Sequence, residues 1–223
     1  RDTGIIGNTG LRAADAHENP TMTNTFPGHS APSAGFELPL ELLTACHLRV
    51  QDQCSTLLRL VPHIAAHGPD RPAQEAATAV MRYFDTSARH HHDDEERDLF
   101  PALIESMAGS DAVCLRELTA TLTAEHRELE ARWQALRAVL AQVAAGQTVL
   151  LAQDDVSGFA QRYQRHIARE ESELLPMARR LLSDAELDRV GLAMRMRRTG
   201  SRAPANPSAG SPDHSQRSAN GST

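Results

Sequence analysis

Four long segments of this chain repeat apolar residues at intervals of three and four, and short breaker sequences separate them. This spacing gathers the apolar side chains on one face of an α-helix. We expect helices over residues 38–66, 72–109, 110–146 and 156–181, with a shorter helix after Ser183. Short connections between long amphipathic helices make neighbours antiparallel, so the sequence predicts an all-α, up-down-up-down four-helix bundle.

The two ends of the chain lack this periodicity. Residues 1–36 are rich in Gly, Asn, Thr, Pro and Ser, and residues 199–223 are of low complexity. Such segments bury too little apolar surface to fold, so we expect two disordered tails around a folded domain at 37–198. The chain begins at Arg1, and Met22 is a candidate for the genuine start.

Charge and composition exclude several functions. The formal net charge is −6 and no basic face emerges, so we expect no nucleic-acid partner. All 23 basic residues are arginine, which excludes a phosphate-loop lysine and a Schiff-base lysine. We expect the basic cluster of Arg195, Arg197 and Arg198 to be a solvated helix end.

The cysteines and the length of the apolar runs indicate the cellular compartment. Cys46, Cys54 and Cys114 form an odd set without a CxxC pair, which favours a reducing cytoplasm over a disulfide framework. Cys46 and Cys54 are expected to be small core residues. No apolar run approaches the length of a membrane span, so we expect a cytoplasmic protein without a membrane partner.

Each apolar stripe is interrupted near its middle by a histidine, and two of the interruptions continue one turn later with a glutamate. These six residues are His47, His91, Glu95, His126, His166 and Glu170. Residues four apart share a helix face, so each His–Glu pair points at one place. Buried carboxylates without partners are costly, and we therefore expect a cation between them. Imidazole and carboxylate ligands suit iron, manganese or zinc, and carboxylates can bridge two metals.

An internal repeat strengthens this prediction. The stretches HHDDEERDLFP, residues 91–101, and HIAREESELLP, residues 166–176, both place His ten residues and Glu six residues before a proline. His92 with Glu96 has the same four-residue spacing as His91 with Glu95, but only the latter pair keeps the proline register. A slip of one residue remains open at this stage.

These motifs resemble the hemerythrin-like, or HHE cation-binding, proteins over roughly residues 38–182. The two HxxxE elements with their prolines, the Glu125–His126 pair and the first-helix His47 occur in the family's order. The resemblance implies a non-haem di-iron centre with an oxo or hydroxo bridge. It also implies that Glu95 and Glu170 bridge the ions, and that the terminal ligands are His47, His91, His126 and His166.

One position departs from the family's oxygen carriers. They have a further histidine one turn before the third-helix histidine, where this chain has Leu122. Glu130, one turn after His126, is either near the site or on a solvated face. Members with four histidines and two glutamates are associated with iron–sulfur cluster repair under nitrosative stress. Those members usually carry an N-terminal cysteine-bearing domain, whereas no cysteine precedes residue 38 here.

Three functions follow from this resemblance. The leading expectation is a di-iron protein that binds O₂ or NO for sensing, storage or stress response rather than for turnover. The second is a di-iron oxidoreductase or an iron–sulfur cluster repair protein, whose redox partner the sequence does not identify. The third is a bundle with a structural metal, with manganese or zinc as alternatives to iron.

The remaining histidines and aromatic residues are expected to lie in the core, beside the ligands or in solvent. We expect Trp133 to be a core residue, and Tyr83 and Tyr163 to be either core residues or hydrogen-bond donors to the ligands. The histidines off the inward stripes are expected to be solvated: His63, His67, His90 and His92.

Overall fold

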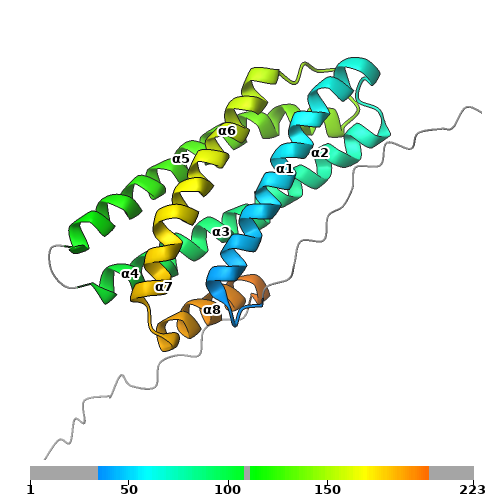
Figure 1. Ribbon diagram of the computed structural model, residues 1–223. Helices are drawn as coiled ribbons and strands as arrows, with labels where there is room; N and C mark the ends of the chain where they lie inside the picture. The colour runs from blue at the N-terminus through cyan, green and yellow to red at the C-terminus, as the bar shows by residue number, and fades with distance from the viewer. Residues whose placement is uncertain (1–34, 108–110, 201–223) are drawn as a thin grey trace, which may run out of the picture.

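The computed structural model describes residues 35–107 and 111–200, and every regular element within these ranges is helical. Four long helical rods lie side by side, and a shorter helix crosses one end (Figure 1). The rods are α1 (Pro39–His67), then α2 (Arg71–Tyr83) to α4 (Phe100–Ser106), then α5 (Asp111–Ala144), then α6 (Gln153–Arg169) to α7 (Leu175–Leu181). For the residues in these two ranges, the prediction of an all-α fold is confirmed.

The helix boundaries lie close to those expected from sequence. The first rod ends at His67, five residues beyond Pro62, because Gly68 then adopts a positive φ of 71°. Asp70 starts the second rod as an N-cap, since its side chain accepts a hydrogen bond from the backbone N–H of Ala73 at 3.0 Å. The short helix expected after Ser183 is α8 (Asp184–Thr199), which begins with a capping box of Ser183 and Glu186.

The described part of the expected tails is short. Phe36 packs against the core, and Thr199 ends α8. Residues 1–34 and 201–223, where we expected disorder and named Met22 as a candidate start, lie outside the described ranges.

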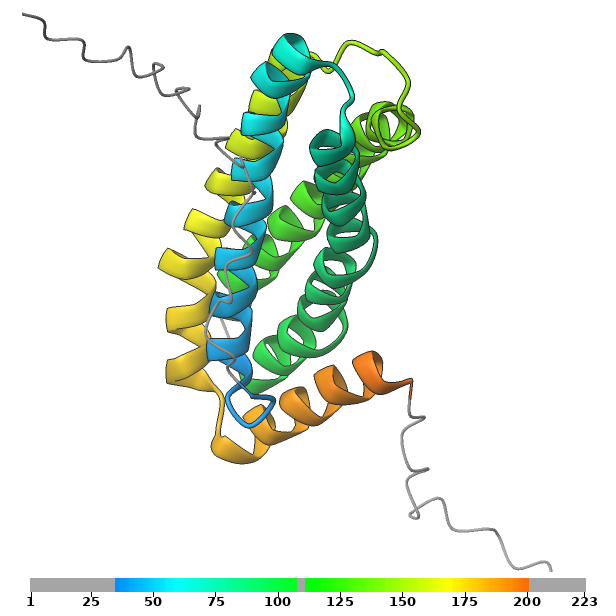
Figure 2. The same ribbon diagram turned by 90° about the vertical axis from the view of Figure 1, so that its right-hand side faces the viewer.

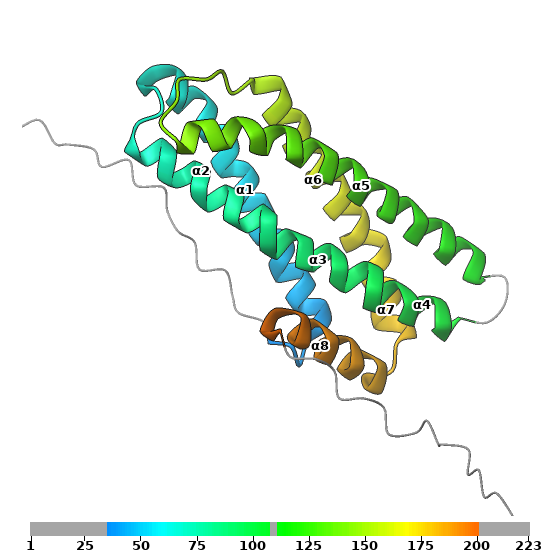
Figure 3. The same ribbon diagram turned by 180° about the vertical axis from the view of Figure 1, so that it is seen from behind.

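The rods pack in a closed arrangement of neighbours. Helix α1 contacts α2 and α6, and α5 contacts the same two helices from the other side. Seen from behind, the rod of α2, α3 (Arg89–Asp94) and α4 runs along α5 while α1 and α6 lie beyond it (Figure 3). The four inner faces therefore meet along a common axis.

The apolar core is divided in two. One part, here called the Phe84 cluster, includes Leu57, Phe84, Trp133 and Phe159. The other, the Leu103 cluster, includes Leu43, Leu103, Leu122 and Leu174. Trp133 is a core residue as expected, and its indole N–H donates to Asp85 Oδ1 at 2.9 Å. The six buried histidines and glutamates belong to neither cluster, and they form a separate polar group within the core.

Helix α8 lies across the end of the rods (Figure 2). Arg197 and Arg198 both pair with Asp94, which is fully buried, and Arg197 also donates to Asp98 Oδ2 at 2.5 Å. The expectation of a solvated helix end was wrong for these two arginines, because the sequence did not reveal their buried partner on the second rod.

The internal repeat appears in the backbone as two matching π-helical turns. These are η2 (Glu95–Leu99) in the second rod and η3 (Glu170–Leu174) in the fourth, and a third such turn is η1 (Phe84–Ala88). Pro101 and Pro176 follow η2 and η3 at the start of α4 and α7. Proline lacks an N–H and its ring crowds the carbonyl four residues earlier, so a wider turn accommodates it.

Candidate metal centre

The structure brings all six sequence-predicted site residues together in the core. None of their side chains is more than 2% exposed, and they converge from all four rods: His47, His91, Glu95, His126, His166 and Glu170. Every rod supplies a histidine, whereas the glutamates come only from the π turns η2 and η3. The two repeats therefore deliver their first glutamate to the same place.

Two groups of potential ligand atoms share both glutamates. One group is His47, His91, Glu95 and Glu170, and the other is Glu95, His126, His166 and Glu170. Within each group the atoms lie within 4.8 Å of one another. Glu170 connects the groups, because one of its oxygens lies 3.0 Å from His47 Nε2 and the other 2.8 Å from His166 Nε2.

Glu95 links the same two groups less tightly. Its oxygens lie 3.6 Å from His91 Nε2 and 3.3 Å from His126 Nε2. Each glutamate thus faces one histidine from each half of the site, which is the position of a carboxylate that bridges two ions.

Three further carboxylates hold the outer nitrogens of the histidines. Glu171 Oε1 lies 2.6 Å from His47 Nδ1, Glu96 Oε1 lies 2.8 Å from His126 Nδ1, and Glu125 Oε2 lies 2.9 Å from His166 Nδ1. A carboxylate on one ring nitrogen fixes the tautomer and the ring orientation, and leaves the other nitrogen free to bind a metal. Sequence reasoning did not assign Glu171 or Glu96 this role, although both directly follow a predicted ligand.

In the protein without metal, burial and neighbouring charges shift the pKa values of the buried histidines and of Glu95. Burial lowers the pKa of His47, but hydrogen bonds to Glu170 and Glu171 outweigh burial and raise that pKa to about 10. Burial likewise opposes the charge on His126, but its carboxylate neighbours raise the pKa to about 11. Burial and the charge of Glu170 raise the pKa of Glu95 to about 7. Protons on the histidines therefore offset the carboxylates, and a metal ion must displace those protons to bind.

The donor set fits metal ions. Both oxygens of Glu95 and of Glu170, and Nε2 of His47, are buried and make no well-directed hydrogen bond, although histidine nitrogens lie 2.8–3.6 Å from the glutamate oxygens. An unsatisfied buried polar atom costs about 1–3 kcal/mol, more for a charged group, so four such carboxylate oxygens in one place require a compensating cation. Imidazole and carboxylate ligands are those that iron, manganese and zinc accept.

The ambiguity between Glu95 and Glu96 is resolved by their positions. Glu95 faces the centre, whereas Glu96 turns outward and pairs with His126 Nδ1 and with Arg127. His91 belongs to the first group together with Glu95. The pair that keeps the proline register, His91 with Glu95, is therefore the one in which both side chains are buried at the centre.

Two of the four histidines expected to be solvated are not. His63 is only 10% exposed and lies 2.9 Å from Asp70 Oδ1. His92 Nε2 is buried without a hydrogen-bond partner, and His92 forms a third group of potential ligands with His126 and His166. The expectation failed for His92 because it assumed a regular helix, whereas π turns on both sides of α3 change the rotation of the helix there. His67 is exposed as expected, and His90 is partly buried.

The other uncertain positions are now placed. The hydroxyl of Tyr83 donates to the carbonyl of Cys46 at 3.3 Å, and Glu130 accepts from Gln134 instead of joining a group of ligands. Leu122 is fully buried in the Leu103 cluster. Tyr163 is adjacent to the site, since its ring centre lies 6.4 Å from that of His166.

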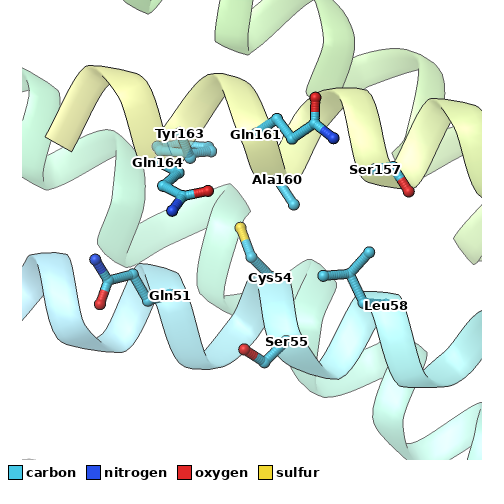
Figure 4. A pocket seen from close by; sticks show the side chains of 9 residues that line it. All are labelled: Gln51, Cys54, Ser55, Leu58, Ser157, Ala160, Gln161, Tyr163 and Gln164. Carbon is cyan, nitrogen blue, oxygen red and sulfur yellow. The ribbon is translucent and has the colours of Figure 1, made fainter. Parts of the chain in front are cut away.

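A surface cavity of about 390 Å³ lies between α1 and α6. Figure 4 shows Cys54 and Leu58 of α1 facing Ala160 and Tyr163 of α6 across it. Tyr163 is adjacent both to this cavity and to the metal centre, where its ring stacks at 6.1 Å on that of His92.

Comparison with known proteins agrees with the geometry. The family model for the hemerythrin HHE cation binding domain matches residues 38–178. An uncharacterized protein from Haemophilus influenzae is 34% identical over 160 residues, which cover 72% of this chain and 90% of the relative. Within the described residues, no helix is long and apolar enough to cross a membrane.

Proposed function

This chain belongs to the hemerythrin HHE cation-binding family, and we propose that it binds a pair of iron ions and, through them, O₂ or NO, for sensing, storage or a stress response. The observation that carries this proposal is the sharing of Glu95 and Glu170 between two groups of buried ligands. Two adjacent ions with two common carboxylates would satisfy the four buried oxygens of Glu95 and Glu170.

The proposed ligands fall into two halves. His47 and His91 would hold one ion, His126 and His166 the other, and Glu95 and Glu170 both. We propose that the four rods form an up-down-up-down bundle, because this packing keeps one histidine from each rod in the core. Residues 37–198 would be the folded unit. Iron is the metal favoured by the family, with manganese and zinc as the alternatives.

The surrounding residues would prepare the site for a small ligand. A ferrous pair held by these ligands would supply the electrons and the coordination position that a diatomic molecule needs. Glu96, Glu125 and Glu171 hold the imidazoles in orientation, and the two apolar clusters keep bulk water out. The cavity beside Tyr163 supports the proposal, since it brings solvent within one aromatic ring of the centre.

The test is anaerobic loading with ferrous iron followed by addition of O₂ or NO. We expect two irons per chain and, on addition of the gas, an oxo-to-iron charge-transfer band or a nitrosyl band in the visible spectrum. Glu130→Gln is the matched control, because this partly exposed glutamate on α5 lies outside the ligand groups. Two bound irons without either band would contradict ligand binding and favour a structural metal.

The same preparation separates binding from turnover. With an electron donor present, a binding protein takes up its ligand once per centre, whereas an oxidoreductase consumes NO or peroxide repeatedly. Loss of gas in large excess over protein would replace the present proposal with the enzymatic alternative. Metal analysis of protein purified without added metal decides between iron, manganese and zinc.

A further inference from the structure

We propose that Arg197 and Arg198 of α8 are positioning residues for the metal centre, because they hold the π turn η2 that carries Glu95. This inference rests on the proposed function, since it concerns one of the two glutamates that the ions would share. It couples two separate parts of the protein, the metal centre in the core and the helix that lies across the end of the rods.

Asp94 is the residue through which α8 contacts the turn. It directly precedes Glu95, and its side chain is fully buried although it carries a carboxyl group. Arg198 donates to both carboxylate oxygens of Asp94, at 3.1 Å to Oδ1 and 2.5 Å to Oδ2. Paired hydrogen bonds between a guanidinium and a carboxylate fix orientation as well as position. Because Asp94 and Glu95 share a planar peptide unit, a fixed Asp94 restricts the direction in which Glu95 points.

Arg197 provides a second anchor on the same turn. One of its terminal nitrogens pairs with Asp94, and the other donates to Asp98 Oδ2 at 2.5 Å. Asp94 precedes η2 and Asp98 lies near its end, so the two anchors stand on either side of Glu95 in the chain. A π turn is a rare and irregular segment of helix. Arg197 therefore holds both ends of this irregular segment with one side chain.

The helix that carries the arginines is itself firmly placed. Met194 is fully buried in the Leu103 cluster. Gly191 lies so close to the segment before α1 that a Cβ atom there would be 2.1 Å from the carbonyl oxygen of Phe36. The guanidinium carbon of Arg198 lies 5.6 Å from the centre of the Phe36 ring, within the range of a cation–π contact. Helix α8 is therefore a fixed support for the turn.

Glu95 depends on such support more than Glu170 does. The oxygens of Glu170 lie 2.8 and 3.0 Å from their nearest histidine nitrogens, whereas those of Glu95 lie 3.3 and 3.6 Å from theirs. The histidines therefore hold Glu170 more firmly, and the position of Glu95 depends more on the backbone of η2. In the second repeat the residue before the glutamate is Arg169, which pairs with Glu125 of α5 instead of with α8.

A purely structural role for the two arginines makes a different prediction. A buried ion pair adds little net stability compared with apolar side chains of the same size. If the arginines serve the fold alone, their removal lowers the free energy of unfolding and leaves the metal affinity of the folded protein unchanged. If they position Glu95, the metal affinity itself falls. Coupling between two sites is reciprocal, so metal binding must then also strengthen the docking of α8.

The experiment compares Arg197→Ala and Arg198→Ala with Arg195→Ala. Each of the first two variants leaves the other arginine on Asp94, which keeps that carboxylate paired. Arg195 is the matched control, because it lies on the same helix but pairs with Glu37, outside the second rod. Circular dichroism of the metal-free variants verifies that they fold, and each is then titrated with Co²⁺ while bound metal is counted.

We expect the parent protein and Arg195→Ala to bind two ions with the same affinities. In Arg197→Ala and Arg198→Ala both ions should bind at least about fivefold more weakly, since both groups of ligands include Glu95. Lysine keeps the charge but not the paired hydrogen bonds of arginine, so Arg198→Lys should also bind metal more weakly than the parent.

Amide hydrogen exchange measures the reciprocal effect on α8. Loading the parent protein with Co²⁺ should slow the exchange of the α8 amides about fivefold or more, and should slow it less in Arg198→Ala. The first turns of α2 are the internal control, because they lie at the opposite end of the rods (Figure 2) and should be slowed less than α8.

Other results would overturn the inference. Two ions bound with parental affinity in Arg197→Ala and Arg198→Ala would show that these arginines serve the fold alone. Equal weakening in Arg195→Ala would show that any loosening of α8 has the same effect, without positioning through Asp94. Fewer than two ions in the parent protein would overturn the proposed function, and this inference with it.

Discussion

The two repeats, residues 91–101 and 166–176, place equivalent residues at the metal centre but meet different surroundings. In each, the histidine and the first glutamate face the centre, and the second glutamate holds a histidine of another rod. Three residues after the histidine, however, the first repeat has Asp94 and the second has Arg169. Asp94 is buried under α8, whereas Arg169 pairs with Glu125 near the surface.

This difference shows which positions the centre constrains. Under the proposed function, the residues that face the centre keep the same type in both repeats because each half would supply the same bridging oxygens. A residue that faces away from the centre instead suits the segment that packs against it, and α8 packs against the second rod at Asp94. Variants at equivalent positions test how similar the two repeats are in metal binding and in stability, from the largest expected effect to the smallest.

Removal of either shared glutamate should have the same, large effect. Glu170→Ala and Glu95→Ala each take ligand oxygens from both groups, so we expect both ions to be lost, with apparent affinities at least about 100-fold weaker. Metal counting after dialysis measures this. Glu130→Gln should retain both ions, and a variant that loses only one ion would show that its glutamate does not bridge.

The arginines of α8 should matter more for stability than their counterpart in the second repeat. Replacing Arg197 and Arg198 with alanine leaves the carboxylate of Asp94 buried without a partner, which costs about 3–5 kcal/mol. Arg169→Ala should cost about 1 kcal/mol or less, since its partner Glu125 is 18% exposed and keeps its contact with His166. Urea unfolding of the metal-free variants measures both losses of unfolding free energy. Equal losses would contradict the proposed difference between the two repeats.

The outer glutamates should act on different ions. Glu96→Ala frees His126 and should weaken the ion at His126 and His166, whereas Glu171→Ala frees His47 and should weaken the other. Loss of such an orienting carboxylate costs about 10–100-fold in metal affinity. Stepwise Co²⁺ titration resolves the two ions, and the same ion weakened in both variants would contradict the assignment.

Raising the pH should destabilise the metal-free protein modestly. The pKa of His47 lies near 10 and that of His126 near 11, above the ordinary value of 6.5. The folded state therefore binds more protons than the unfolded state, and the stability these groups contribute is present below pH 6.5 and lost as pH rises toward 10. We expect the melting temperature in a chelator to fall over this interval, by about 2–4 °C per kcal/mol lost.

Metal-loaded protein is the control for this pH series. Once ions replace the protons, the histidines no longer titrate between pH 7 and 10, so the melting temperature should stay nearly level. A parallel fall in both forms would show that groups outside the centre cause it.

The sequence predicted the parts of the site that depend on helical periodicity. Histidines and glutamates on the inward stripes were recognisable because residues four apart share a face, and the proline register separated Glu95 from Glu96. The helix boundaries followed from glycine, proline and capping residues. These signals are local, so a single sequence contains them.

The features that escaped prediction depend on contacts between distant segments or on irregular helix geometry. Nothing near Arg197 in the sequence points to Asp94, about a hundred residues earlier, and a regular helix gives no reason for His92 to approach His126. The π turns on both sides of α3 (Arg89–Asp94) change the rotation of the helix there, which three- and four-residue spacing does not reveal.

The paired π turns also set the rotational phase of the rods that carry them. A turn closed by i→i+5 hydrogen bonds contains one residue more than a regular helical turn. Both turns begin at an inward glutamate, so the helix positions that follow Glu95 and Glu170 are shifted in phase by the same amount in the two repeats. The likeness of the two halves of the site is thus built into the backbone as well as into the side chains.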